Sequence, residues 1–152
     1  MKSLLLIVAL GLGVAARAQS KDTKALVESQ NFVFKAQTAL PMGGRSRNLT
    51  GDYDLKVSKD AVVSYLPYFG RAYVAPIDPS KGGIEFTSKD FSYISVPGKK
   101  DGWTVTIKPR DYKDVQQLIL SISSEGYASL QVVSTSRQAI SFNGVIAGKG
   151  SR

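Results

Sequence analysis

From residue 32 onward, the chain is a succession of short segments in which apolar and polar side chains alternate, separated by turn residues rather than by helices. The pattern is clearest where Trp103, Val105 and Ile107 alternate with polar residues until Pro109 ends the run. A period of two predicts half-buried β-strands. About nine are expected, at 32–37, 53–58, 61–66, 84–88, 91–96, 103–108, 118–122, 128–134 and 138–146.

Strands at this spacing predict an all-β domain, because a parallel sheet requires helices between its strands. We expect an antiparallel meander that forms a lipocalin-like barrel, complete or incomplete, or a strongly curved sheet. A two-sheet sandwich is the alternative. One short amphipathic helix, at 20–30, precedes the strands; Ser20 or Asp22 is its expected cap, and it should plug or flank the sheet.

Two of the strand connections share one sequence. Residues 58–60 and 88–90 both read Ser-Lys-Asp, and each aspartate is followed seven residues later by a proline, Pro67 or Pro97. We therefore expect each tripeptide to form the turn of a β-hairpin, 53–66 and 84–96.

The most unusual stretch runs from residue 65 to 73 and concentrates aromatic residues, a proline, a glycine and an arginine in one strand connection. The backbone should bend at the proline and again at the glycine. The rings either belong to the core or line the mouth of a ligand pocket in which the arginine anchors an acid or phosphate group. The candidate ligand-binding residues are Tyr65, Pro67, Tyr68, Phe69, Gly70, Arg71 and Tyr73.

Residues 66–73, with Ala75-Pro76 and Gly82–Phe86 after them, resemble the signature of the DUF4251 family, which comprises small exported proteins known mainly from Bacteroidetes-type bacteria. The runs 131–134 and 137–146 are similar to the closing strands of that family. The resemblance covers nearly all of the chain after its first residues. It implies an exported, mostly β domain, and it implies no activity and no catalytic residue.

The first residues have the parts of a secretory signal peptide. A basic start is followed by an apolar run from Leu4 to Val14 and by Ala16-Arg17-Ala18, so we expect cleavage between Ala18 and Gln19. The run is shorter than the ~20 apolar residues that a membrane-spanning helix needs. The expected mature protein is one β domain, 19–147, with a flexible tail, 148–152, located in the periplasm or outside the cell.

The chain contains no histidine and no cysteine. Nucleophilic schemes that need either residue are therefore excluded, as are the usual zinc sites, thiol chemistry and disulfides, and we expect no metal and no cofactor. Asp52 and Asp54 stand two apart, a spacing that places two carboxylates on one side of a strand. They more readily decorate its solvent face, and no catalytic residue is assigned.

The formal net charge is +8, and removal of Lys2 and Arg17 with the leader lowers it to +6. An exported protein rarely meets nucleic acid, so the available partners for a basic face are anionic envelope components. Scattered lysines also serve simply to keep a β-protein soluble. The residues that a basic face would draw on are Arg45, Arg47, Arg71, Lys99, Lys100, Lys108, Arg110 and Lys113.

The function expected from these features is that of a non-enzymatic envelope protein that binds a small apolar or amphipathic ligand near residues 65–73. The alternative is an interaction protein that binds another envelope component through its sheet or its basic surface. A hydrolase that uses Asp52 and Asp54 is a third and weaker hypothesis. The oligomeric state is left open.

Overall fold

The structure, a computed structural model, describes residues 22–71 and 82–149. A helix occupies residues 22–29, a short 3-10 helix η2 occupies Lys99–Asp101, and the rest of the described chain is mainly strand. The strands are β1 (Phe32–Pro41), β2 (Arg47–Asn48), β3 (Asp54–Val57), β4 (Val62–Leu66), β5 (Ile84–Ser88), β6 (Phe91–Pro97), β7 (Trp103–Pro109), β8 (Val115–Ile122), β9 (Tyr127–Ser134) and β10 (Ile140–Ala147).

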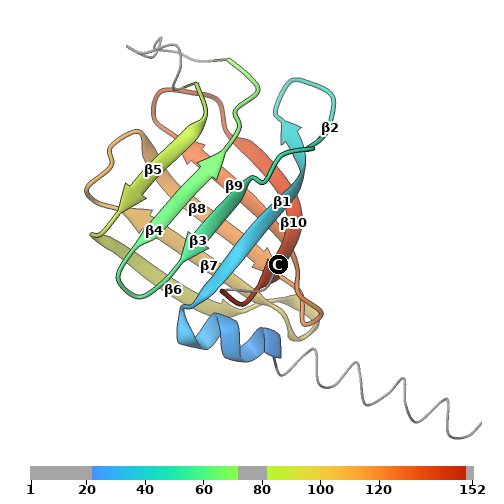
Figure 1. Cartoon of the computed structure of the whole chain (residues 1–152), viewed down its shortest axis with the longest axis vertical. Coiled ribbons are helices and arrows are strands. Elements are labelled where there is room, and N and C mark those ends of the chain that lie inside the picture. Colours follow the sequence, from blue (N-terminus) through green and yellow to red (C-terminus); the bar gives the residue numbers. More distant parts are fainter. Residues whose placement is uncertain (1–21, 72–81, 150–152) are drawn as a thin grey trace, which may run out of the picture.

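All of these strands belong to one sheet, with the order β5-β4-β3-β1-β10-β9-β8-β7-β6 and with β2 paired to β1; each pair is antiparallel. The sheet curls until it is nearly closed: β5, β4, β3 and β1 cross the front of Figure 1, and β6 to β10 lie behind them. The prediction of an all-β, barrel-like domain is confirmed. Within residues 22–71 and 82–149, no helix is long and apolar enough to cross a membrane.

The first predicted hairpin is confirmed, and the second is wrong. Strands β3 and β4 pair across residues 58–61, with Val57 opposite Val62. Strands β5 and β6 follow each other just as closely in the sequence, yet β5 pairs with β4 and β6 with β7, so the two strands are the opposite ends of the sheet. The second Ser-Lys-Asp turn is therefore a corner at which the barrel stays open.

The carboxylate of Asp111 explains this corner. It accepts hydrogen bonds from the Ser88 hydroxyl at 2.5 Å, from the backbone N–H of Lys89 at 2.8 Å and from that of Asp90 at 3.2 Å. These bonds, the Ser88 bond above all, lower the pKa of Asp111. Arg110 adds an ion pair to Asp90 at 2.6 Å. Contacts from the β7–β8 connection thus hold the turn in a form that separates β5 from β6.

The interior of the barrel is filled by side chains. Along β3, β4 and β5, every second residue is buried and those between are more exposed, as a sheet with one covered face requires. Glu85, between buried Ile84 and Phe86, points to solvent as expected. The bulkiest fully buried side chains are Phe32, Phe34, Phe142, Leu55, Leu66, Ile107, Leu118, Leu120, Leu130 and Ile140.

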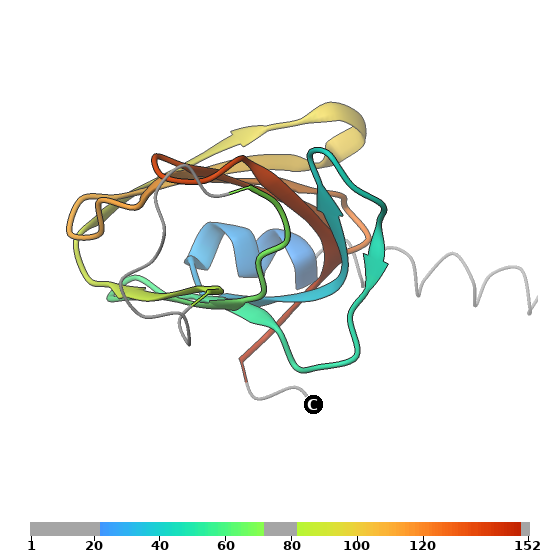
Figure 2. The same ribbon diagram turned by 90° about the horizontal axis from the view of Figure 1, so that it is seen from above.

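The N-terminal helix covers one end of the barrel, and Figure 2 places it within the outline of the strands. Val27 is fully buried on its inner face. The carbonyl oxygen of Val27 accepts a hydrogen bond from the Tyr93 hydroxyl at 2.8 Å, which ties the helix to β6. Burial raises the pKa of Tyr93 to about 12. The predicted helix therefore acts as an end plug.

Candidate functional site

Residues 67–71, which follow β4, lie at the end of the barrel opposite the helix (Figure 1). The Tyr68 hydroxyl lies 2.9 Å from the carbonyl oxygen of Arg71 and 3.0 Å from that of Gln138, within donor reach of both. The backbone N–H of Gln138 donates to the Arg71 carbonyl, and the Arg71 N–H donates to the Gln138 side-chain oxygen. Gly70 makes the bend with φ +147°, a conformation that favours glycine. Residues 68–71 are thus fixed against the start of β10.

Arg137, in the β9–β10 connection, holds this end of the barrel together. Its side chain is almost entirely buried and donates to the carbonyl oxygens of Gly82 at 2.7 Å and Gly83 at 3.2 Å, and to the Asp114 carboxylate at 3.3 Å. Its guanidinium also lies over the Tyr68 ring. The other Asp114 oxygen accepts a hydrogen bond from Ser136. Three chain segments therefore meet on one buried cation.

The structure divides the predicted site. Tyr65 points outward from the sheet, 49% exposed, and stacks on Tyr53 with 5.6 Å between ring centroids. Pro67 is half-buried, and Tyr68 packs against the core, so these residues support the segment rather than offer a surface. Tyr73 lies outside the described residues. Phe69, Gly70 and Arg71 remain as candidates for ligand contact.

Phe69, Gly70 and Arg71 line one side of a groove of about 330 Å³. The other side comes from the turn after β1, which contains Arg45, and from Arg47 at the start of β2. Arg47 packs over the Phe69 ring, with its guanidinium carbon 4.6 Å from the ring centroid. The full lining is Pro41, Gly43, Gly44, Arg45, Arg47, Phe69, Gly70, Arg71 and Gln138.

This groove is cationic. Arg45, Arg47 and Arg71 are all exposed, and no aspartate or glutamate stands among the described residues that line it. A cleft lined by one sign of charge concentrates counter-ions and raises the local concentration of an oppositely charged ligand. The guanidinium group presents a planar fork of donors that matches a carboxylate or a phosphate.

The remaining basic residues of the predicted face do not join this groove. Arg110 is paired with Asp90, and Lys99, the first residue of η2, lines a different hollow. Of the eight basic residues considered from the sequence, only Arg45, Arg47 and Arg71 line the groove. The sequence offered no local signal for the part played by Arg137, since its partners come from three distant segments.

The paired carboxylates do not form a site in the described structure. Asp54 begins β3 opposite Lys35 of β1 and Tyr65 of β4, whereas Asp52 is exposed in the preceding turn. Across residues 22–71 and 82–149, no group of three or more acidic side chains stands close enough to hold a metal ion.

Comparison with known proteins identifies the family. The sequence model described as a domain of unknown function (DUF4251) matches residues 15–146. The fold is similar to that of the crystal structure of a DUF4251 family protein from Bacteroides eggerthii DSM 20697, with a TM-score of 0.62 and 13% sequence identity over 86% of this chain and 88% of that one. None of the curated proteins matches. The chain thus belongs to the DUF4251 family.

Proposed function

We propose that the protein is a non-enzymatic binding protein of the cell envelope, and that the cationic groove holds the anionic group of a small amphipathic ligand. One observation carries the proposal: Arg45, Arg47 and Arg71 surround a single groove that has no carboxylate in its described lining. Clustered like charges repel one another, and a bound anion relieves that repulsion. The envelope setting rests on the leader-like sequence of residues 1–18.

The apolar part of such a ligand has a place in the same groove. Phe69 and Pro41 supply apolar surface beside the guanidinium groups. The barrel interior is filled by the core side chains, so the ligand is expected to lie on the rim of the barrel rather than inside it. In the proposed mode, the arginines bind the anionic group (the anion clamp), and Phe69 with Pro41 contacts a short apolar part of the ligand (the apolar shelf). This site on the rim differs from the deep internal cavity of a lipocalin.

Isothermal titration calorimetry with octyl phosphate and with inorganic phosphate tests the proposal. The double variant Arg45→Gln/Arg71→Gln should weaken octyl phosphate binding by roughly tenfold or more, since a charge-assisted hydrogen bond contributes about 1.5–3 kcal/mol. Lys56→Gln/Lys59→Gln, two exposed lysines away from the groove, removes the same net charge and should change the affinity by less than about twofold.

Equal losses in the two double variants would show that only the overall charge of the protein attracts the anion, and would reject a built site. An affinity for octyl phosphate no higher than that for inorganic phosphate would reject the apolar shelf while leaving the anion clamp in place.

Strand β6 favours a second candidate function, an interaction with another envelope protein through the sheet. It is an edge strand of seven residues without a charge, and Ile94 and Val96 are 56% and 47% exposed. Natural edge strands are usually protected by charged residues, because a free edge invites pairing. Crosslinking in the envelope should yield a partner that Ile94→Lys abolishes and that Thr87→Lys, an exposed position on β5, retains.

A further inference from the structure

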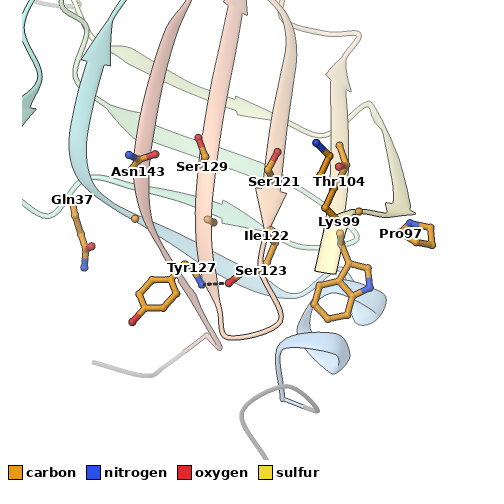
Figure 3. Close-up of a pocket in the computed structure, with 14 residues that line it drawn as sticks. Gln37, Pro97, Lys99, Thr104, Ser121, Ile122, Ser123, Tyr127, Ser129 and Asn143 are labelled. Atoms are coloured by element: carbon orange, nitrogen blue, oxygen red, sulfur yellow. Dashed lines mark hydrogen bonds between the residues drawn. The ribbon is translucent and has the colours of Figure 1, made fainter. Parts of the chain in front are cut away.

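Polar side chains form a row across the outer face of the β1 and β7–β10 part of the sheet. Asn143 on β10 is the cross-strand partner of Ser129 on β9, Ser129 is the partner of Ser121 on β8, and Ser121 is the partner of Thr104 on β7. Gln37, at the irregularity in β1, extends the row at its far end, as Figure 3 shows. With a strand spacing of about 4.8 Å, the row spans about 19 Å.

The row crosses a hollow of about 860 Å³ on this outer face. Tyr127, at the start of β9, lies beside the row, and its side chain is 63% exposed (Figure 3). Pro97, at the end of β6, and Lys99, at the start of η2, flank the hollow at its other end. Trp103 also lines it. The hollow therefore combines a floor of hydroxyl and amide groups with one exposed aromatic side chain, that of Tyr127, whereas the Trp103 ring packs against the core.

Two neighbouring rows of this face carry no charge, and Lys35 on β1 and Lys108 on β7 lie outside them. The row ends at Val96 on β6, and the next row along the strands contains no charged residue either. In contrast, the outward positions of β3 and β5 include Lys56 and Glu85. An ordinary solvated face of a chain with 21% charged residues carries such charges. The members of the second row are Leu40, Ser141, Gln131, Ile119, Thr106 and Ile94.

The side chains of the polar row are available for a ligand. Those of Gln37, Thr104, Ser121, Ser129 and Asn143 make no hydrogen bond to any other residue in the described part of the chain. Each amide both donates and accepts, and so does each hydroxyl. A ligand that matches them offers hydroxyl groups along its length and carries no net charge. The exposed Tyr127 ring suits the apolar face of such a molecule while its hydroxyl stays hydrated.

From this arrangement we infer a second binding site, in which an uncharged oligosaccharide lies along the polar row and packs a sugar ring against Tyr127. The inference does not depend on the cationic groove, because the two hollows share no lining residue. Lys99 is the one charged side chain among the described residues that line the hollow. Selectivity for neutral over acidic sugars follows from the uncharged floor.

The fluorescence of Trp103 provides the test, because Trp103 is the only tryptophan of the chain and lines this hollow. The full mature protein is titrated with the neutral hexasaccharides of maltose, cellulose, xylan and chitin type, and with an oligogalacturonate of the same length. At least one neutral probe should shift the emission in a saturable way. Tyr127→Ala and Asn143→Ala should each weaken that binding by about fivefold or more, as expected for loss of an aromatic or amide contact.

Tyr65→Ala is the matched control, since Tyr65 is an exposed tyrosine on the outer face of β4. It should leave the affinity unchanged, and thermal melting should show that all variants are folded. The inference is overturned if no neutral probe binds at millimolar concentration. It is also overturned if Tyr127→Ala and Tyr65→Ala behave alike, or if the acidic oligosaccharide binds best and Lys99→Gln abolishes its binding.

Discussion

The guanidinium carbon of Arg137 lies 4.6 Å from the centroid of the Tyr68 ring, and Arg47 stands at the same distance from Phe69. The two cation–π pairs differ in their surroundings. Arg137 is buried and hydrogen-bonded to two backbone carbonyls and a carboxylate, whereas Arg47 is exposed beside the cationic groove. The first pair therefore maintains the fold, and the second is free to meet a ligand.

Arg137→Ala should lower the free energy of unfolding by about 2–3 kcal/mol, because it removes charge-assisted hydrogen bonds and leaves buried acceptors without a donor. Arg137→Lys should recover less than half of the loss, since an ammonium group cannot reproduce the planar fork. Urea unfolding followed by circular dichroism measures both. Arg47→Ala, which removes the equally distant but exposed pair, should cost less than about 1 kcal/mol. Equal losses at the two positions would contradict the assignment.

Asp111→Asn should lower the urea midpoint at neutral pH, because Asp111 holds the corner between β5 and β6. The pKa of Asp111 is lowered by its hydrogen bonds, so its contribution is present above the ordinary carboxyl pKa of about 4 and is lost as pH falls through the lowered value. The difference between wild type and variant should therefore shrink in acid. Asp60→Asn, at an exposed position in the first Ser-Lys-Asp turn, should leave the urea midpoint nearly unchanged. A pH-independent effect of Asp111→Asn would argue against the role of its carboxylate at the corner.

Tyr93→Phe should reduce stability at neutral pH by about 0.5–1.5 kcal/mol through loss of the bond to the Val27 carbonyl. Burial raises the pKa of Tyr93 to about 12, so the folded state retains a proton that the unfolded chain releases near pH 10. Stability from this group is complete below about pH 10 and is lost as pH rises towards 12. Alkaline unfolding with tyrosinate absorbance checks this. Tyr127→Phe, at an exposed position, should leave the curve as in wild type.

The two proposed sites should respond differently to salt. Raising the ionic strength from about 0.1 M to 1 M shortens the Debye length from about 10 Å to 3 Å, so phosphate binding in the arginine groove should weaken strongly. Binding of a neutral oligosaccharide to the outer face should change little. Parallel titrations of one protein sample with both probes make the comparison. A similar salt dependence for both probes would mean that one basic surface accounts for all of the binding.

Much of the fold was predictable because alternation along a strand depends only on local sequence. The strands around Leu55 and Val105 lie as predicted, and the helix reaches the end of the barrel. Strand β1 continues to Pro41, beyond the predicted end at residue 37, because its pairing with β10 resumes after an irregularity between Ala36 and Thr38. The β5–β6 corner was not predictable from its turn sequence, since Asp111 decides it from more than twenty residues away.

Only part of the candidate site was predictable, because local sequence indicates where a strand ends and bends but not which distant segment lies beside the bend. Phe69 and Arg71 follow a proline and flank a glycine, and such a bend leaves the strand pattern and reaches the rim. Tyr65 still belongs to β4, whose alternation turns it outward beside buried Leu66. Arg45 and Arg47 reach the same groove because the chain after β1 lies beside residues 69–71. No local sequence pattern predicts this tertiary contact.

Backbone amide mapping by nuclear magnetic resonance, during a titration with octyl phosphate, tests the central claim most directly. The account predicts saturable shifts confined to the groove, at residues 43–47, 69–71 and 138, and their loss in Arg45→Gln/Arg71→Gln. Shifts spread over lysine-bearing surfaces such as Lys56 and Lys59, or shifts that persist in the double variant, would contradict an anion site on the rim of the barrel.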